Sequence, residues 1–197
     1  SVLYYNLTAK TALTTLVFWP TWWISRLPRN SVNLDSEHTI YKTFSKFLTD
    51  QFLKPIFAEA KLTAGKGDAE RWFSMLSTGQ LKSLKERTDL SFAPDNGRSF
   101  APDEKVNLKI WTKNIDKLMV KEFEINAFNY YLKHGKEVST AIELDGLSAT
   151  RERLIESDLP PIRRSLRTVS FPDLKKRGTY VVEFIGNGIS SRALVRK

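Results

Sequence analysis

The alternation of apolar and polar positions is clearest near the end of the chain. Apolar side chains occupy Tyr180, Val182 and Phe184, and the run ends at the tight turn Gly186-Asn187-Gly188. Residues 191–196 alternate again directly afterwards. A period of two predicts a β-strand on each side of the turn, and therefore a hairpin.

The same alternation recurs upstream of the hairpin. It predicts strands over residues 106–111, 118–125, 138–144 and 166–171, with an edge strand around residues 154–155. Phe128, Tyr130 and Tyr131 lead into a turn at residues 134–136. Seven or so strands, with a turn about every ten residues, are typical of an antiparallel immunoglobulin-like β-sandwich.

The first half of the chain has a different period. Residues 35–62 carry apolar side chains three and four positions apart, which predicts a helix that Pro55 kinks or ends. Asp68 is a cap for a second helix, and Ser77-Thr78-Gly79-Gln80 is a capping box for a third. We expect the apolar faces of these helices to pack together, with a groove for a partner helix as the alternative.

A turn-rich linker at residues 92–97 separates the two patterns. We therefore predict an α+β chain with three parts: an aromatic-rich segment at 1–34, a helical unit with its linker at 35–97, and the sandwich at 98–197.

Composition narrows the possible functions. The 197 residues are 41% hydrophobic and 27% charged, which is typical of a globular protein. They include no cysteine, which excludes disulfides, Cys-based zinc sites and thiol nucleophiles in this stretch. Because the chain begins with Ser1 and not with Met, we expect a piece of a longer polypeptide.

The most apolar stretch is residues 13–24, which is too short and too interrupted for a membrane-spanning helix. It contains Trp19, Trp22 and Trp23, which predict either a platform for a sugar or lipid headgroup or side chains buried against other elements.

Few residues point to catalysis. The two histidines, His38 and His134, lack metal-ligand spacing and have no serine or carboxylate associated with them in the sequence. No pair of carboxylates stands out as a catalytic dyad. We therefore predict a protein that is not an enzyme and that needs neither cofactor nor metal.

The formal net charge of +9 is compatible with an anionic partner. The strongest candidate site is a basic cluster in two segments, composed of Arg163, Arg164, Arg167, Lys175, Lys176 and Arg177. The alternative is that these side chains protect exposed strand edges from pairing. Because no nucleic-acid-binding motif accompanies them, sequence-specific nucleic-acid recognition is not expected.

Two passages resemble macroglobulin-like domains of the α2-macroglobulin class. Residues 100–108, Phe-Ala-Pro-Asp-Glu-Lys-Val-Asn-Leu, are similar to the opening of such a domain, and residues 174–184, Leu-Lys-Lys-Arg-Gly-Thr-Tyr-Val-Val-Glu-Phe, to a late strand. The resemblance covers residues 98–197 and implies a structural module of a large extracellular, cell-surface or periplasmic protein.

Three functional hypotheses follow. The first is a non-catalytic interaction module of a multidomain protein, whose partners are neighbouring domains or other proteins. The second is a binding module for an anionic polymer through the basic cluster, and the third is carbohydrate or lipid binding through the three tryptophans.

Overall fold

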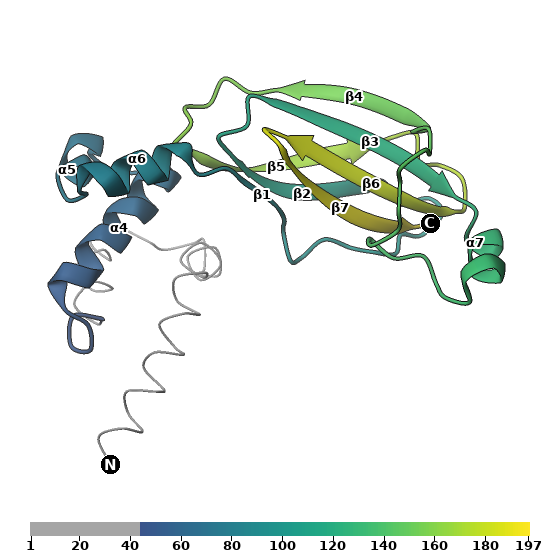
Figure 1. Ribbon diagram of the computed structural model, residues 1–197, viewed down its shortest axis with the longest axis horizontal. Helices are drawn as coiled ribbons and strands as arrows, with labels where there is room; N and C mark the ends of the chain where they lie inside the picture. Colours follow the sequence, from purple (N-terminus) through teal and green to yellow (C-terminus); the bar gives the residue numbers. More distant parts are fainter. Residues whose placement is uncertain (1–43) are drawn as a thin grey trace, which may run out of the picture. The chain divides into compact units, whose positions relative to one another are not determined.

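The computed structural model describes residues 44–197, and the chain divides into two compact units, Ser1–Leu81 and Lys82–Lys197. Figure 1 shows the elements of both units. The predictions for the segment 1–34 and for His38 lie outside the described residues.

Two helices lie entirely within the described part of the first unit. They are α4 (Asp50–Ala64) and α5 (Ala69–Phe73). Of the two alternatives predicted for Pro55, it does not end the helix, because Pro55 lies inside α4. The helix ends instead at Gly65, whose left-handed backbone (φ 58°) directs its N–H to the carbonyl of Leu62.

The start of α4 also differs from the prediction. The expected continuous helix over 35–62 is interrupted by turn and bend residues at 45–48, and α4 begins after Thr49, whose backbone is extended. As a result Phe47, an expected member of the apolar stripe, is 81% exposed.

Both predicted caps are confirmed. The Asp68 side chain accepts from the Glu70 N–H at 3.0 Å at the start of α5. At the start of α6 (Thr78–Glu86), the Gln80 side chain accepts from the Ser77 N–H at 2.9 Å, and the Ser77 hydroxyl accepts from the Gln80 N–H at 3.3 Å.

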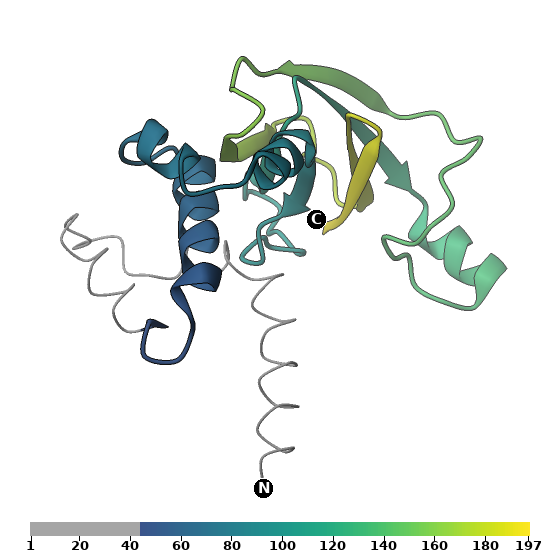
Figure 2. The ribbon, with the colours of Figure 1, turned by 60° about the vertical axis from the view of Figure 1, so that its left-hand side comes forward.

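The second unit contains two antiparallel sheets, which Figures 1 and 2 show from different sides. One sheet has the order β1-β2-β5 and the other β4-β3-β6-β7. The strands are β1 (Asp89–Phe92), β2 (Val106–Lys113), β3 (Lys117–Ile125), β4 (Arg151–Glu156), β5 (Arg164–Phe171), β6 (Thr179–Gly186) and β7 (Ile189–Arg196). A helical region followed by an immunoglobulin-like sandwich confirms the predicted fold class.

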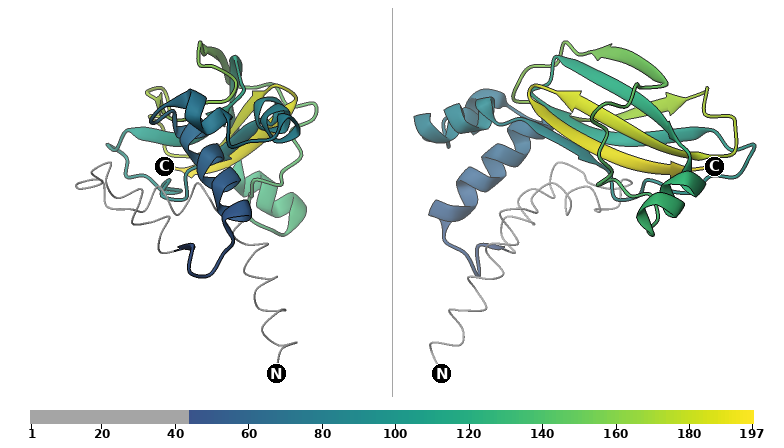
Figure 3. Two further views of the ribbon diagram at one scale, coloured as in Figure 1. Left: turned by 90° about the vertical axis from the view of Figure 1, so that its left-hand side faces the viewer. Right: turned by 45° about the vertical axis from the view of Figure 1, so that its right-hand side comes forward.

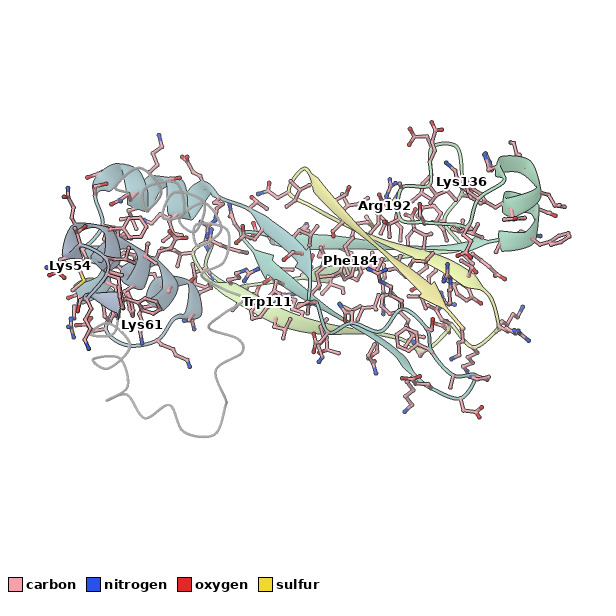
Figure 4. All side chains as sticks on the ribbon, turned by 90° about the horizontal axis from the view of Figure 1, so that it is seen from below. Lys54, Lys61, Trp111, Lys136, Phe184 and Arg192 are labelled. Atoms are coloured by element: carbon pink, nitrogen blue, oxygen red, sulfur yellow. The ribbon has the colours of Figure 1, made fainter. Side chains whose placement is uncertain are left out.

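The main core lies between the sheets and follows from the alternation. Val106, Leu108 and Ile110 of β2 are at most 1% exposed. Val182 and Phe184 of β6 are fully buried in the same cluster; Phe184 is labelled in Figure 4. Burial of one such side chain contributes about 1.5–3 kcal/mol.

The strand count agrees with the prediction, but the strands are not the same set. Residues 138–144, predicted as a strand, form turns and irregular structure. Both edges of β3 are already occupied, by β4 and β6, so this segment has no place beside it. Val138, Ile142 and Leu144 form a second apolar cluster with Phe123 and Val181 instead.

Strand β1 supplies the seventh strand from a region assigned to the helical unit and its linker. Its register places Leu90 opposite Thr112 and Phe92 opposite Ile110. The Phe92 ring packs edge-on against Phe184, with centroids 5.2 Å apart. The sandwich unit therefore begins before residue 98, the predicted start.

The C-terminal end of α6 is fastened to β2 by a buried lysine. Lys113 is 1% exposed, and its ammonium donates to the carbonyl of Leu84 at 2.6 Å and to that of Arg87 at 2.5 Å. The last carbonyls of a helix have no partner within the helix. Lys113 supplies one from a neighbouring strand.

Candidate interaction surfaces

The described residues include no group of three or more His, Cys, Asp or Glu side chains arranged to hold a metal ion. His134 lies at the end of α7 (Ala127–His134), where its ring stacks on Tyr130 with centroids 4.5 Å apart. Within residues 44–197, no helix has the length and apolarity needed to cross a membrane.

Arg164, from the first segment of the predicted basic cluster, has partners inside the protein. Its guanidinium lies over the Trp111 ring at 4.6 Å, and its Nε is 3.6 Å from the Asp89 carboxylate. Burial lowers the pKa of Arg164, and the neighbouring Asp89 opposes that shift. With 13% of its side chain exposed, Arg164 serves packing more than recognition.

Arg167 also has internal partners. It donates to the carbonyl of Glu156 at 3.3 Å and to the hydroxyl of Ser157, so it connects β5 to the end of β4. Arg153 makes a similar link, donating to the Ser170 carbonyl at 2.7 Å while lying 4.6 Å from the Phe171 ring centroid. These arginines join the edge strands of the two sheets.

The second segment is different, because Lys175, Lys176 and Arg177 are exposed in the connection between β5 and β6. Among the described residues their side chains form neither hydrogen bonds nor ion pairs. We call these three residues the basic loop.

The structure does not bring the two segments together. Arg163 and Arg164 lie where β5 begins, and the basic loop follows its other end. Seven residue steps from Arg164 to Phe171 separate these ends by about 23 Å, at roughly 3.3 Å per residue. The six basic residues therefore do not form one continuous cluster.

Helix α7 was not predicted from the sequence, although it carries recognisable signals. The Asn126 side chain accepts from the Asn129 N–H at 3.0 Å and caps its start. Gly135, at φ 64°, ends it in the left-handed conformation. Phe128, Tyr130 and Tyr131 were predicted only to lead into a turn at residues 134–136, so these caps were not recognised as the ends of a helix.

The apolar side of α7 faces solvent. Phe128 is 70% exposed, Tyr131 55% and Leu132 67%, and these positions three and four apart share one side of the helix. We call them the α7 face. Most surface helices turn their apolar side to the core, so this orientation is reversed.

The opposite side of α7 borders a shallow hollow of about 280 Å³ above the outer face of β3. Asn129, Tyr130 and Lys133 line it from the helix. The strand and the later segment contribute Phe123, Ile125, Ile142 and Leu147 among others. Leu147 is 49% exposed, so further apolar surface lies beside the helix.

The fold defines the class of this module, an immunoglobulin-like domain that carries an exposed apolar helix face and an exposed basic loop. Comparison with known families agrees. Residues 118–197 match the family model described as AbpF first immunoglobulin-like domain, and residues 36–88 match the one described as Actin-binding protein F N-terminal domain. The chain thus carries an immunoglobulin-like domain over this segment, as predicted.

Actin-binding protein F of Dictyostelium discoideum is similar to this chain, with 38% identity over 159 residues. The match covers 79% of this chain but only 7% of that protein's length. A crystal structure of native α2-macroglobulin from Escherichia coli spanning domains MG0-NIE-MG1 is also similar, with 14% identity and a TM-score of 0.39. That match covers 56% of this chain and 38% of the other.

Proposed function

We propose that this chain belongs to a longer multidomain protein, in which its immunoglobulin-like unit is a non-catalytic interaction module. The observation that carries the proposal is the 38% identity to a protein of which this chain spans only 7%. The similarity extends to both units, because the two matching family models fall on separate parts of the chain. The exposed α7 face supplies a surface suited to protein contacts.

The first partner to test is the actin filament, since the similar protein is named for actin binding. The full 197-residue chain should sediment with actin filaments in a saturable manner and remain in the supernatant without them. A folded chain that stays in the supernatant at every filament concentration would contradict actin binding by this part of the protein.

The basic loop supports a second candidate function, binding of an anionic polymer. Its three side chains are exposed and have no partner among the described residues, so their charge is available to phosphate or sulfate groups. Replacing Lys175, Lys176 and Arg177 by alanine should lower the salt concentration that elutes the chain from heparin.

A matched control removes the same charge from the opposite end of the sandwich. Lys82 and Lys85 lie on α6, and Lys117 begins β3, far along the strands from the basic loop. Their replacement by alanine should change the eluting salt concentration less. Equal effects of the two triple variants would indicate net charge alone, and the basic loop would then not be a site.

The tryptophan platform stays a prediction, since Trp19, Trp22 and Trp23 lie outside the described residues.

A further inference from the structure

We propose that the α7 face docks the immunoglobulin-like domain that follows this one in the longer protein. The inference rests on the proposed function, which makes this chain part of a multidomain protein. It adds the surface that makes the contact and the neighbour that covers it.

The first argument is energetic. Phe128, Tyr131 and Leu132 are each more than half exposed, and no residue of α7 is buried. Burial of one large apolar side chain contributes about 1.5–3 kcal/mol. A partner that covers all three side chains therefore gains a substantial part of the free energy that holds two domains together. Within the described residues, the sandwich itself leaves that surface uncovered.

The second argument is position. In the register of the four-stranded sheet, Ile125 lies opposite Thr179, and Thr179 lies opposite Arg196. Neighbouring strands are about 4.8 Å apart, so Ile125 and Arg196 are separated by about 10 Å. Helix α7 starts two residues after Ile125, and the described chain ends one residue after Arg196.

An ion pair connects the end of β7 to the segment that follows α7. The Arg196 guanidinium lies 2.7 Å from the carboxylate of Glu137, in the segment just after α7. Figure 1 and the right-hand view of Figure 3 both show α7 and the C-terminus at the same end of the sandwich. A domain joined by a short connection to Lys197 therefore starts beside the α7 face.

The third argument identifies the neighbour. The matching family model is described as a first immunoglobulin-like domain, which implies that others follow in proteins of that kind. Interfaces between domains of one chain resemble transient protein–protein interfaces, and the buried centre of such interfaces is enriched in aromatic and other apolar side chains. A following domain of the same class therefore fits both the place and the chemistry of the surface.

The experiment compares the 197-residue chain with the same chain extended, in its natural sequence, through the next domain. Hydrogen exchange of the α7 amides is followed by mass spectrometry in both proteins. In the extended protein we expect hydrogen exchange over residues 127–134 to slow at least about tenfold, because the contact between the two domains must open before these amides can exchange. Replacement of Phe128 and Leu132 by glutamate should abolish the slowing.

The matched control replaces two exposed leucines outside α7, Leu154 at 48% and Leu159 at 42%, by glutamate. This variant should keep the slow exchange. The milder variant Leu132→Ala, which favours helix formation, should reduce the protection without disturbing α7 itself.

Several results would overturn the proposal. They are a natural reading frame that ends at Lys197, equal α7 exchange in the two proteins, and protection that survives the glutamate variant. A dimer of the 197-residue chain that the glutamate variant dissociates would instead make a second copy the occupant.

The actin experiment keeps the two proposals separate. Loss of co-sedimentation in the glutamate variant of the 197-residue chain would assign the α7 face to actin, and would overturn the docking inference while supporting the proposed function. Co-sedimentation that persists, together with absent α7 protection, would overturn the inference alone.

Discussion

At the scale of single residues, buried charge defines the strongest local constraints. Lys113 ends β2 and Glu122 lies on β3, the next strand along the chain, and both side chains are at most 4% exposed. A charge removed from water needs close polar partners to be tolerated. Replacing either residue therefore tests how the sandwich compensates for burying it.

Lys113 should be important for stability because it bonds two helix-end carbonyls. We expect Lys113→Met to lower the free energy of unfolding by about 2–3 kcal/mol, since hydrogen bonds to charged groups are stronger than neutral ones. Lys109 is the control, because it lies four positions earlier on β2 and pairs with Asp95 while 45% exposed. Lys109→Met should cost less than about 1 kcal/mol in urea titrations, and equal losses would contradict the special role of Lys113.

Glu122 should make stability depend on pH. Burial raises the pKa of Glu122, and Arg153 and Arg151 oppose the shift without cancelling it. Because the folded state holds this proton more tightly than the unfolded state does, its stabilising contribution is complete below pH 4.5, the ordinary value, and is lost as pH rises through the raised pKa.

The variant Glu122→Gln should therefore show a smaller loss of stability than the parent protein as pH rises above 4.5. Urea unfolding at a series of pH values measures this slope. Glu152→Gln, on the exposed part of β4, should keep the parent slope. An unchanged slope in Glu122→Gln would show that Glu122 is not its source.

At the scale of elements, the closing hairpin depends on its turn. Asn187 and Gly188 both have left-handed backbones, with φ values of 46° and 78°. This pair matches the twist of two antiparallel strands. The Asn187 side chain also donates to the Thr88 hydroxyl at 3.1 Å and to the Asn114 carbonyl at 3.2 Å, so the turn holds the segment that enters β1.

Two glycine-to-alanine substitutions should change the free energy of unfolding in opposite directions. Gly188→Ala should destabilise the protein by about 1–2 kcal/mol, because a Cβ disfavours the left-handed conformation. Gly79 lies in α6, where an added Cβ meets nothing within 4 Å, and Gly79→Ala should stabilise by about 0.5–1 kcal/mol. Thermal unfolding measures both, and the same sign for both variants would contradict the backbone explanation.

At the scale of the whole molecule, the sandwich unit has its own core and its own anchored helix end. We expect residues 82–197, produced alone, to unfold in a single cooperative transition, because both sheets and the carbonyls bound by Lys113 lie within them. Phe184→Ala should lower the stability of this fragment and of the full chain alike, by about 3–5 kcal/mol. A fragment without a cooperative transition would show that the first unit is needed for the fold.

The caps and most of the strands were predictable because they depend on local patterns. The alternation of apolar and polar positions predicted the strands around Leu108 and Phe184, and the side-chain chemistry of Asp68 and Ser77 predicted the two helix caps. Helix α7 was not predicted although its Asn126 and Gly135 caps are visible in the sequence, because Phe128, Tyr130 and Tyr131 were interpreted only as leading into the turn at residues 134–136. The α7 face was missed with it.

By itself, the sequence determined which segments alternate, where the chain turns and which helices are capped, since these features depend on neighbours a few residues away. Only the tertiary structure decided that residues 89–92 complete a sheet while residues 138–144 cover one, because both outcomes depend on which strand edges are free. It also separated Arg164 from the basic loop, since the length of β5 lies between them. Distance along a strand and competition for its edges are properties of the assembled sheets, and no local pattern contains them.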